Sequence, residues 1–375
     1  MLRNKLLAAA VVSAFASPMA AIAEDAKPAG PAIPTLSQIL DSSGITMSGY
    51  IDTAYSHASK NIEGTSATAG RVFDAQNNSF VLHQVGLTIA KQPKEGFGGV
   101  VNVTAGKDAE VINAADGTGS STFNLTQAFA QYATGNLTVI AGKYTTLQGT
   151  EVIASPSDVN FSRSLLFFGE PVTHTGIRGT YAISDKISLI AGVNNGIASS
   201  AKDTNKGKTL ELGAVLTPIK PLSIGIYDLN GKEDIGGGLS DTRNSFNIVA
   251  SYTVIDPLTI GLEYLRVSQK ELGASSRKYS GEALYVTYMI TPKWRVAVRG
   301  EIMKDADGLL FLTPASTDNK YKEGTVTLSY LATDSFEVRG EVRTDHSTNN
   351  FYLDASTGTT SKSLTTYALQ GIYKF

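Results

Sequence analysis

Charged side chains at alternating positions are the residues of this sequence whose chemistry is easiest to interpret. Between Trp294 and Ile302, arginine and glutamate alternate with apolar residues, and the same pattern recurs between Phe336 and Arg343. Successive side chains of a β-strand point to opposite faces, so each segment would have one charged face and one apolar face. A single sheet can carry so much charge on one face only if that face meets water.

These charged faces predict the lining of a water-filled lumen. The candidate wall residues are Arg178, Arg295, Arg299, Glu301, Arg339, Glu341 and Arg343. The arginines could form a basic wall that orients or selects solutes, or the acidic and basic residues could neutralise one another. The tetrapeptide Val-Arg-Gly-Glu occurs at 298–301 and again at 338–341, which suggests repetition of a hairpin or a chance match.

Other kinds of site chemistry have little support. The four histidines, His57, His83, His174 and His346, are scattered, and neither G-x-S-x-G nor H-E-x-x-H occurs. The acidic residues around Asp108 lack the spacing of a calcium-binding loop. With no cysteine in the chain, a thiolate ligand or nucleophile is excluded. We therefore expect no enzyme, no metal site and no cofactor.

The composition and the N-terminus predict an exported protein. The chain has 375 residues, a net charge of -2 and no strongly basic stretch, which argues against a nucleic-acid partner. Residues 1–23 have the basic, apolar and A-x-A regions of a signal peptide. Residues 24–43 contain three prolines and predict a periplasmic linker with a short helix. Beyond the N-terminus no apolar run approaches the ~18 residues of a membrane helix.

From residue 44 to residue 375 the side-chain types alternate with the two-residue period of β-strands, which predicts an all-β protein. About sixteen runs follow one another, the number and length of strands typical of a transmembrane antiparallel β-barrel. Connections after odd-numbered runs are mostly long, and those after even-numbered runs are short and rich in Gly, Pro, Asn and Asp. Long extracellular loops and short periplasmic turns are the asymmetry of bacterial outer-membrane barrels. The predicted runs are 44–57, 79–91, 97–106, 122–133, 137–145, 172–183, 187–196, 207–217, 221–230, 243–254, 258–270, 278–290, 293–304, 321–332, 335–346 and 363–375.

The last predicted strand carries aromatic and apolar residues on one face. Tyr367, Leu369, Tyr373 and Phe375 alternate with more polar positions. This strand resembles the signal read by the outer-membrane barrel assembly machinery, which would make that machinery a partner of the chain.

Several segments resemble the putative β-barrel porins of the OmpL-like type. They are 35–40 (TLSQIL), 48–55 (SGYIDTAY), 141–144 (AGKY), 160–164 (NFSRS) and 171–176 (PVTHTG). The resemblance covers mainly the first half of the chain. It implies a porin among the lipids of the bacterial outer membrane, a homotrimer, and passive diffusion of small hydrophilic solutes and ions.

General porins suggest a role for the long connection 146–171, because their third long loop folds inward and narrows the pore. Glu151, Asp158, Arg163 and Glu170 would then project charge into the lumen opposite the arginines, whereas an outer cap would contact only solvent. Lys143 and His174 could line the same constriction, but a register slip of one residue would turn them outward. The alternative function is a plugged structural or adhesive barrel without an open pore. The solute, the ion selectivity and any gating are not decided by the sequence.

Overall fold

The computed structural model describes residues 40, 42–63, 69–197, 203, 205–236, 239–271, 273, 275–313 and 319–375. The predicted signal peptide and most of the predicted linker and helix at 24–43 lie outside these residues. Residues 43–375 form one compact unit. None of the helices in the described part of the chain is long and apolar enough to cross a membrane.

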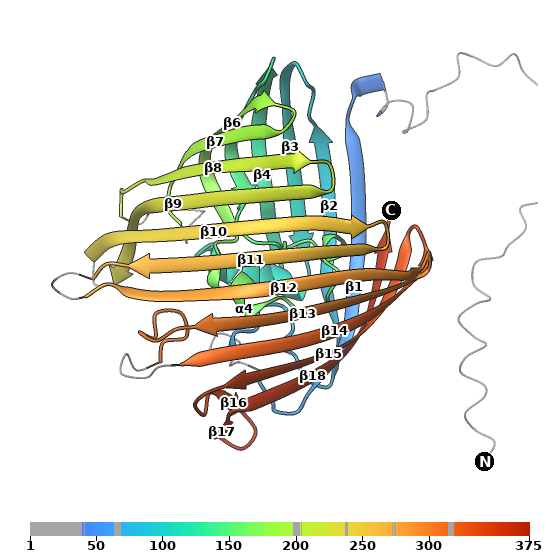
Figure 1. Cartoon of the computed structure of the whole chain (residues 1–375), viewed down its shortest axis with the longest axis vertical. Coiled ribbons are helices and arrows are strands. Elements are labelled where there is room, and N and C mark those ends of the chain that lie inside the picture. Colours follow the sequence, from blue (N-terminus) through green and yellow to red (C-terminus); the bar gives the residue numbers. More distant parts are fainter. Residues whose placement is uncertain are drawn as a thin grey trace, which may run out of the picture. The chain divides into compact units, whose positions relative to one another are not determined.

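The described part of this unit holds sixteen antiparallel strands that close into a barrel (Figure 1). Each strand pairs with its neighbours in the chain, and β1 pairs with β18 to close the seam, with Ile51 opposite Tyr373. Closure leaves no barrel strand with an unpaired edge. The barrel strands are β1 (Thr46–Ala58), β2 (Ser79–Lys91), β3 (Gly96–Ala105), β4 (Phe123–Thr134), β5 (Leu137–Thr145), β6 (Thr173–Ser184), β7 (Ile187–Asn194), β8 (Thr209–Ile219), β9 (Leu222–Gly236), β10 (Leu239–Ile255), β11 (Leu258–Gln269), β12 (Arg277–Thr291), β13 (Trp294–Lys304), β14 (Lys320–Thr333), β15 (Phe336–Ser347) and β18 (Ser363–Lys374).

The predicted fold class is confirmed, and most predicted strand bounds agree with the observed ones within two residues. The connection predicted at 231–242 is wrong, because β9 runs to Gly236 and β10 begins at Leu239. Its glycines and charged residues suggested a loop. Yet the strand period continues there, since Glu233 is buried while Lys232 and Asp234 are exposed.

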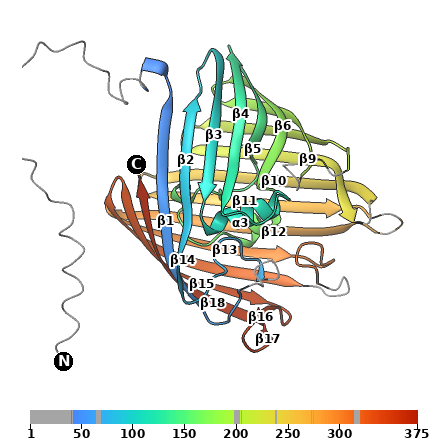
Figure 2. The same ribbon diagram turned by 180° about the vertical axis from the view of Figure 1, so that it is seen from behind.

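Several long connections contain secondary structure in the part of the chain that the structure describes. The helix α3 (Lys107–Ala115) follows β3 (Figure 2). The connection between β5 and β6 holds a 3-10 turn, η1 (Ser155–Ser157), and the short helix α4 (Leu165–Gly169). Between β15 and β18 a small hairpin forms from β16 (Tyr352–Asp354) and β17 (Thr359–Ser361).

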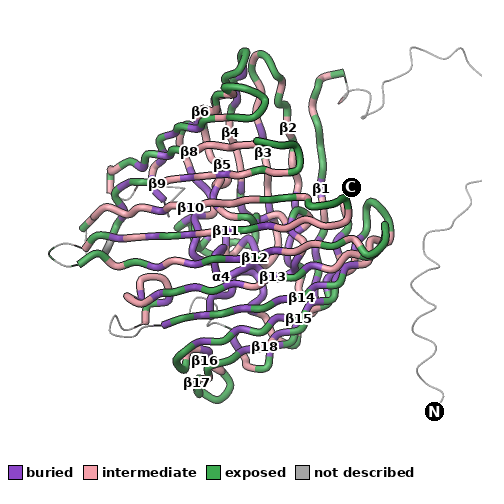
Figure 3. The backbone as a smooth tube through the Cα atoms, in the orientation of Figure 1, coloured by how far each residue is buried: buried purple, intermediate pink, exposed green. Residues whose placement is uncertain are grey.

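The barrel has an apolar outer face and a polar inner face. Exposed and buried residues alternate along the strands (Figure 3), as they do in β13, where Val298 and Ile302 are exposed while Arg299 and Glu301 are buried. Tyr252, Tyr288, Trp294 and Tyr330, near the short turns, fit an interfacial girdle, and the first three are exposed. Polar side chains are therefore gathered inside the barrel, where the loops meet them.

Candidate functional site

The connection 146–172, called here the inner loop, lies inside the barrel. Its residues are hydrogen-bonded to the inner faces of strands on different sides of the barrel. Gln84 Nε2 of β2 donates to the Ile153 carbonyl at 2.9 Å, and Gln148 Nε2 donates to the Ser245 carbonyl of β10 at 2.9 Å. Asn160 Nδ2 reaches Thr327 Oγ1 of β14 at 2.6 Å. The loop thus crosses the lumen between β2 and β10, which lie opposite each other in the sixteen-strand order.

The helix α4 anchors the loop through apolar side chains. Ser164 caps its start, because its Oγ accepts a hydrogen bond from the Phe167 N–H at 3.0 Å. Leu165 and Leu166 are fully buried and belong to an apolar cluster with side chains of β11 to β14. The Tyr279 hydroxyl also donates to the Gly169 carbonyl at 2.5 Å. Burial of two leucines contributes about 3–6 kcal/mol to holding α4 in place.

The glutamates of the repeated tetrapeptide hold the loop by its backbone N–H groups. Glu341 of β15 accepts hydrogen bonds from the N–H groups of Phe161 and Ser162, at 2.7 and 2.9 Å. Glu301 of β13 accepts in the same way from Leu165 and Leu166, at 2.7 and 3.1 Å. Each carboxylate therefore binds two consecutive peptide groups of the inner loop.

The arginines of the repeat hold the loop by its carbonyl groups. Arg299 Nη1 donates to the Ser162 carbonyl at 2.7 Å, and Arg339 Nη1 donates to the carbonyls of Ser155 and Asn160, both at 3.3 Å. The two Val-Arg-Gly-Glu segments thus bind adjacent parts of one loop with the same pair of side chains. The sequence showed this repeat, but a repeat alone does not say what its side chains contact.

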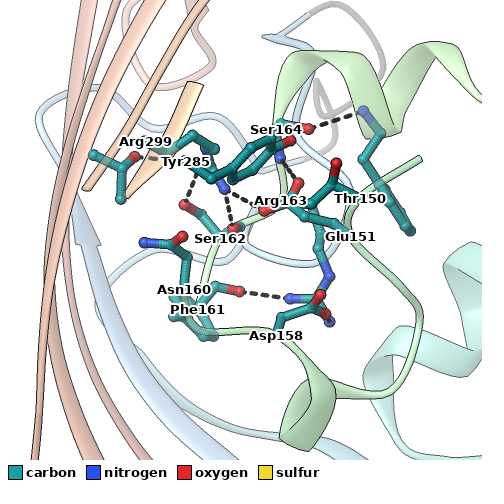
Figure 4. A network of polar contacts seen from close by, with 12 residues as sticks. Thr150, Glu151, Asp158, Asn160, Phe161, Ser162, Arg163, Ser164, Tyr285 and Arg299 are labelled. Atoms are coloured by element: carbon teal, nitrogen blue, oxygen red, sulfur yellow. Dashed lines mark hydrogen bonds and ion pairs between the residues drawn. The ribbon is translucent and has the colours of Figure 1, made fainter. Parts of the chain in front are cut away.

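The four predicted loop residues are buried and joined to one another or to the wall. Figure 4 shows three of them, Glu151, Asp158 and Arg163. Glu151 accepts from Arg299 Nη1 at 2.5 Å and from the Ser164 N–H at 2.6 Å. Asp158 pairs with Arg163 Nη2 at 2.9 Å. Arg163 also donates to the carbonyls of Val152, Phe161 and Ile153. Glu170 accepts from Asn247 Nδ2 of β10 at 3.0 Å.

Burial changes the acidity of two of these carboxyl groups. Loss of water raises the pKa of Asp158 to about 7, although the Arg163 guanidinium acts in the opposite direction. Burial and the neighbouring Glu263 raise the pKa of Glu170 well above its usual range. The inner loop therefore contains a carboxyl group, that of Asp158, whose charge can change at moderate pH.

Each arginine of the predicted wall has a carboxylate partner. Arg178 pairs with Glu211 at 2.8 Å and lies 4.3 Å from the ring of Tyr144. Arg339 pairs with Glu337 at 2.7 Å, and Glu337 also binds Arg295. Arg299 and Arg343 both approach Glu323, and Arg343 also pairs with Asp345 at 2.6 Å. The arrangement matches the interpretation in which lumen charges neutralise one another, and an ion-selective wall stays a prediction.

The partner carboxylates Glu211 and Glu323 were not among the predicted site residues. The alternation of side chains along a strand would have identified Glu323, because it lies between the exposed residues Lys322 and Gly324 of β14. Lys143 is bound to Asp116, and His174 contacts Thr146 Oγ1 at 3.2 Å. Asp108 binds His83 at 2.9 Å.

The predicted assembly residues lie on the outer face of the barrel. Tyr367, Leu369, Tyr373 and Phe375 are all about half exposed or more. Phe375 also exchanges two backbone hydrogen bonds with Gly49, at 2.8 and 2.9 Å, next to the seam. Recognition of these residues by an assembly machinery stays a prediction.

Among the cavities of the described residues, two border different parts of the inner loop. One, of about 800 Å³, is bounded by residues 71–76, α3 and residues 167–172, near the ends of the long connections. The other, of about 150 Å³, lies between Thr150, Glu151 and Asp158 and the ends of β10 to β12 near the short turns. The inner loop forms part of the wall of both.

A protein-family model described as "Putative beta-barrel porin-2, OmpL-like" matches residues 44–375. No curated protein sequence matches the chain.

Solved structures of outer-membrane proteins share the fold at low sequence identity. The outer-membrane channel DcaP of Acinetobacter baumannii has a TM-score of 0.62 at 14% identity, covering 88% of this chain and 97% of that one. OmpT of Vibrio cholerae has a TM-score of 0.60 at 12% identity, with coverage of 88% and 97%. An anion-selective porin from Comamonas acidovorans has a TM-score of 0.59 at 11% identity, with coverage of 88% and 99%.

Proposed function

The chain belongs to the family of OmpL-like putative β-barrel porins and is a β-barrel of the bacterial outer membrane, and from this premise we propose that it forms a diffusion channel. The channel is filled with water, is narrowed by the inner loop, and passes small hydrophilic solutes and ions. It is not an enzyme and binds no cofactor.

The inner loop carries this proposal. It crosses the lumen and is bonded to charged side chains of β13 and β15 through its own backbone. A barrel of sixteen strands leaves room for an aqueous channel unless its interior is filled. A loop bound at this depth would set the narrowest width of that channel. Because the arginines of the wall are paired with carboxylates, we further propose that ion selectivity is weak.

One observation favours the alternative of a plugged barrel. Buried apolar side chains of α4, of β11 to β14 and of the connection after β13 form one cluster on the inner side, and this cluster fills part of the lumen. A plugged barrel would use its long connections for adhesion or for a structural role.

Single-channel recording in a planar lipid bilayer separates the two functions. We expect discrete, ohmic current steps from the folded protein, and a salt gradient then gives the ion selectivity. A barrel that is demonstrably folded, as judged from its heat-modifiable migration in gels, but carries no current would support the plugged alternative.

We also propose that the channel is a trimer. Support comes from a trimer form of the similar OmpT of Vibrio cholerae. Cross-linking of the protein in its native membrane would test this assembly.

A further inference from the structure

The larger cavity beside the inner loop has the size and the lining of a ligand site. Its volume of about 800 Å³ lies within the range of small-molecule pockets, roughly 300–1,000 Å³. It is bounded by three segments outside the strands: residues 71–76, α3, and residues 167–172. Three segments distant in the sequence therefore meet around one space.

Most of the lining is apolar. Phe73, Phe167 and Phe168 contribute aromatic rings, and Val111 and Ala114 contribute one face of α3. Residues 107, 110, 111 and 114 are spaced by three or four positions, so they share that helix face. Ala114 remains exposed although it faces this apolar space. An apolar body, such as an aromatic ring, would remove this surface from water.

The basic residues of the lining are already neutralised. Lys107 pairs with Glu110 at 2.6 Å. Arg71 is buried and pairs with Asp74 at 2.9 Å and with Asp345 at 2.8 Å. Neither side chain is therefore available to bind an anionic ligand without the loss of an existing ion pair.

Hydrogen-bond acceptors, in contrast, are in excess. Glu63 and Glu170 both line the cavity, and among the described residues neither forms an ion pair. Each has neutral or acidic partners only: Glu63 accepts from the Asn77 N–H at 3.1 Å, and Glu170 is hydrogen-bonded to Asn247 and Glu263. The Oε1 atom of Gln76 is buried and accepts no hydrogen bond from the described part of the chain. The polar lining therefore suits a ligand that donates hydrogen bonds and carries positive charge.

We propose that this cavity binds small organic ammonium compounds with an aromatic or branched aliphatic body. The apolar body packs against Phe167 and Phe168, and the ammonium group donates to Glu170, Glu63 and Gln76. A phenylalanine face also attracts a cation directly. A bound ammonium group holds Glu170 in its ionised form, against the effects of burial and of Glu263. The inference rests on the proposed channel function, since a site near the ends of the long connections selects the solutes that enter.

Direct binding to the folded full chain in detergent tests the proposal without any measurement of current. The probe is 2-phenylethylammonium, titrated by calorimetry, with 3-phenylpropanoate as an anion of the same shape. We expect the ammonium compound to bind about tenfold more tightly than the carboxylate. Equal or tighter binding of 3-phenylpropanoate, or no binding of either probe, would overturn the proposal.

Two variants locate the site. Ala114→Trp fills the cavity and should abolish binding, whereas Ala191→Trp, at an exposed alanine on the outer face of β7, should leave it unchanged. Glu63→Gln with Glu170→Gln keeps the side-chain shape and should weaken binding of the ammonium compound about tenfold. Unchanged binding in either cavity variant would place the ligand elsewhere and refute the site.

The outcome is distinguishable from that of the proposed function. Binding by a barrel that carries no current would support this site and refute the open channel. A conducting barrel that binds neither probe would support the channel and refute this site.

Discussion

The inner faces of two opposite walls differ sharply in charge. In β13 to β15 the lumen side carries Arg299, Glu301, Arg339, Glu341 and Arg343, all buried against the inner loop. In β6 to β9 the buried charged residues, Arg178, Glu211 and Glu233, lie toward the long connections. The inward positions of this wall toward the short turns are uncharged, such as Thr180, Ser188 and Gly213. Charged side chains are therefore concentrated where the wall binds the backbone of the inner loop. We call the short-turn part of β6 to β9 the uncharged wall, and we expect solutes to pass along it.

The largest expected effect separates the two walls by removing one arginine from each. Arg299→Met leaves the buried Glu151 without its ion pair, and Arg178→Met does the same to Glu211, so each should lower the free energy of unfolding by about 3–5 kcal/mol. Only Arg299 donates to the inner loop at Ser162, so only Arg299→Met should raise the single-channel conductance. An equal rise in both variants would show that the charged wall has no special role in holding the loop.

A smaller effect is expected when one loop-binding carboxylate is made neutral. In Glu341→Gln the amide keeps one oxygen acceptor, so one of the two N–H groups of Phe161 and Ser162 loses its acceptor, at a cost of about 1.5–3 kcal/mol. We expect more current noise and faster proteolysis of the loop. Glu282→Gln is the matched control, since Glu282 is exposed on β12 and, among the described residues, forms no hydrogen bond to the inner loop. Protection from protease equal to that of the parent would contradict the anchoring role.

The pH dependence of protein stability tests the role of Asp158, which lies beside Arg163 in the inner loop. Burial raises the pKa of Asp158 from 3.8 to about 7, so its stabilising contribution is complete below about pH 4 and is lost as the pH rises toward 7. Thermal unfolding followed between pH 4 and 8 should show this loss. Asp158→Asn should flatten the profile across that window, and a profile with the same slope in the variant would assign the dependence to another group.

The smallest expected effect concerns the uncharged wall. Ser188→Asp on β7 places a charge in the lumen without breaking a contact of the inner loop, so stability should change by less than about 0.5 kcal/mol. The reversal potential in a salt gradient should shift toward cations. Ser335→Asp, in an exposed short turn, should leave it unchanged. A null result for Ser188→Asp would mean that ions do not pass along this wall.

Much of the fold could be predicted because it depends on local pattern. The two-residue alternation and the turn residues located all sixteen barrel strands. The placement of Arg299 and Glu301 on the inner face of β13 followed from alternation alone. The helix α3 was missed, although Lys107–Ala115 has acidic residues in its first turn, a sequence signal for a helix start. The connection at 231–242 was misjudged because glycine and charge were given more weight than alternation.

The contacts of the candidate site could not be predicted in the same way. The partners of Glu341 are backbone groups 180 and 179 residues away, and those of Glu301 are 136 and 135 residues away. Such contacts arise only when the barrel closes and the loop enters it. Their free energies depend on burial, which no window of the sequence contains. The pairing of Glu323 with both Arg299 and Arg343 has the same origin.

The way in which the inner loop is held has a consequence for how the protein can diversify. Glu301, Glu341 and the arginines beside them bind peptide groups, which every amino acid except proline provides in full. Loop side chains that point away from the wall are therefore free to mutate without detaching the loop. Descendants of such a gene could acquire new permeability by substitutions in a few loop codons while the same barrel sequence supports them.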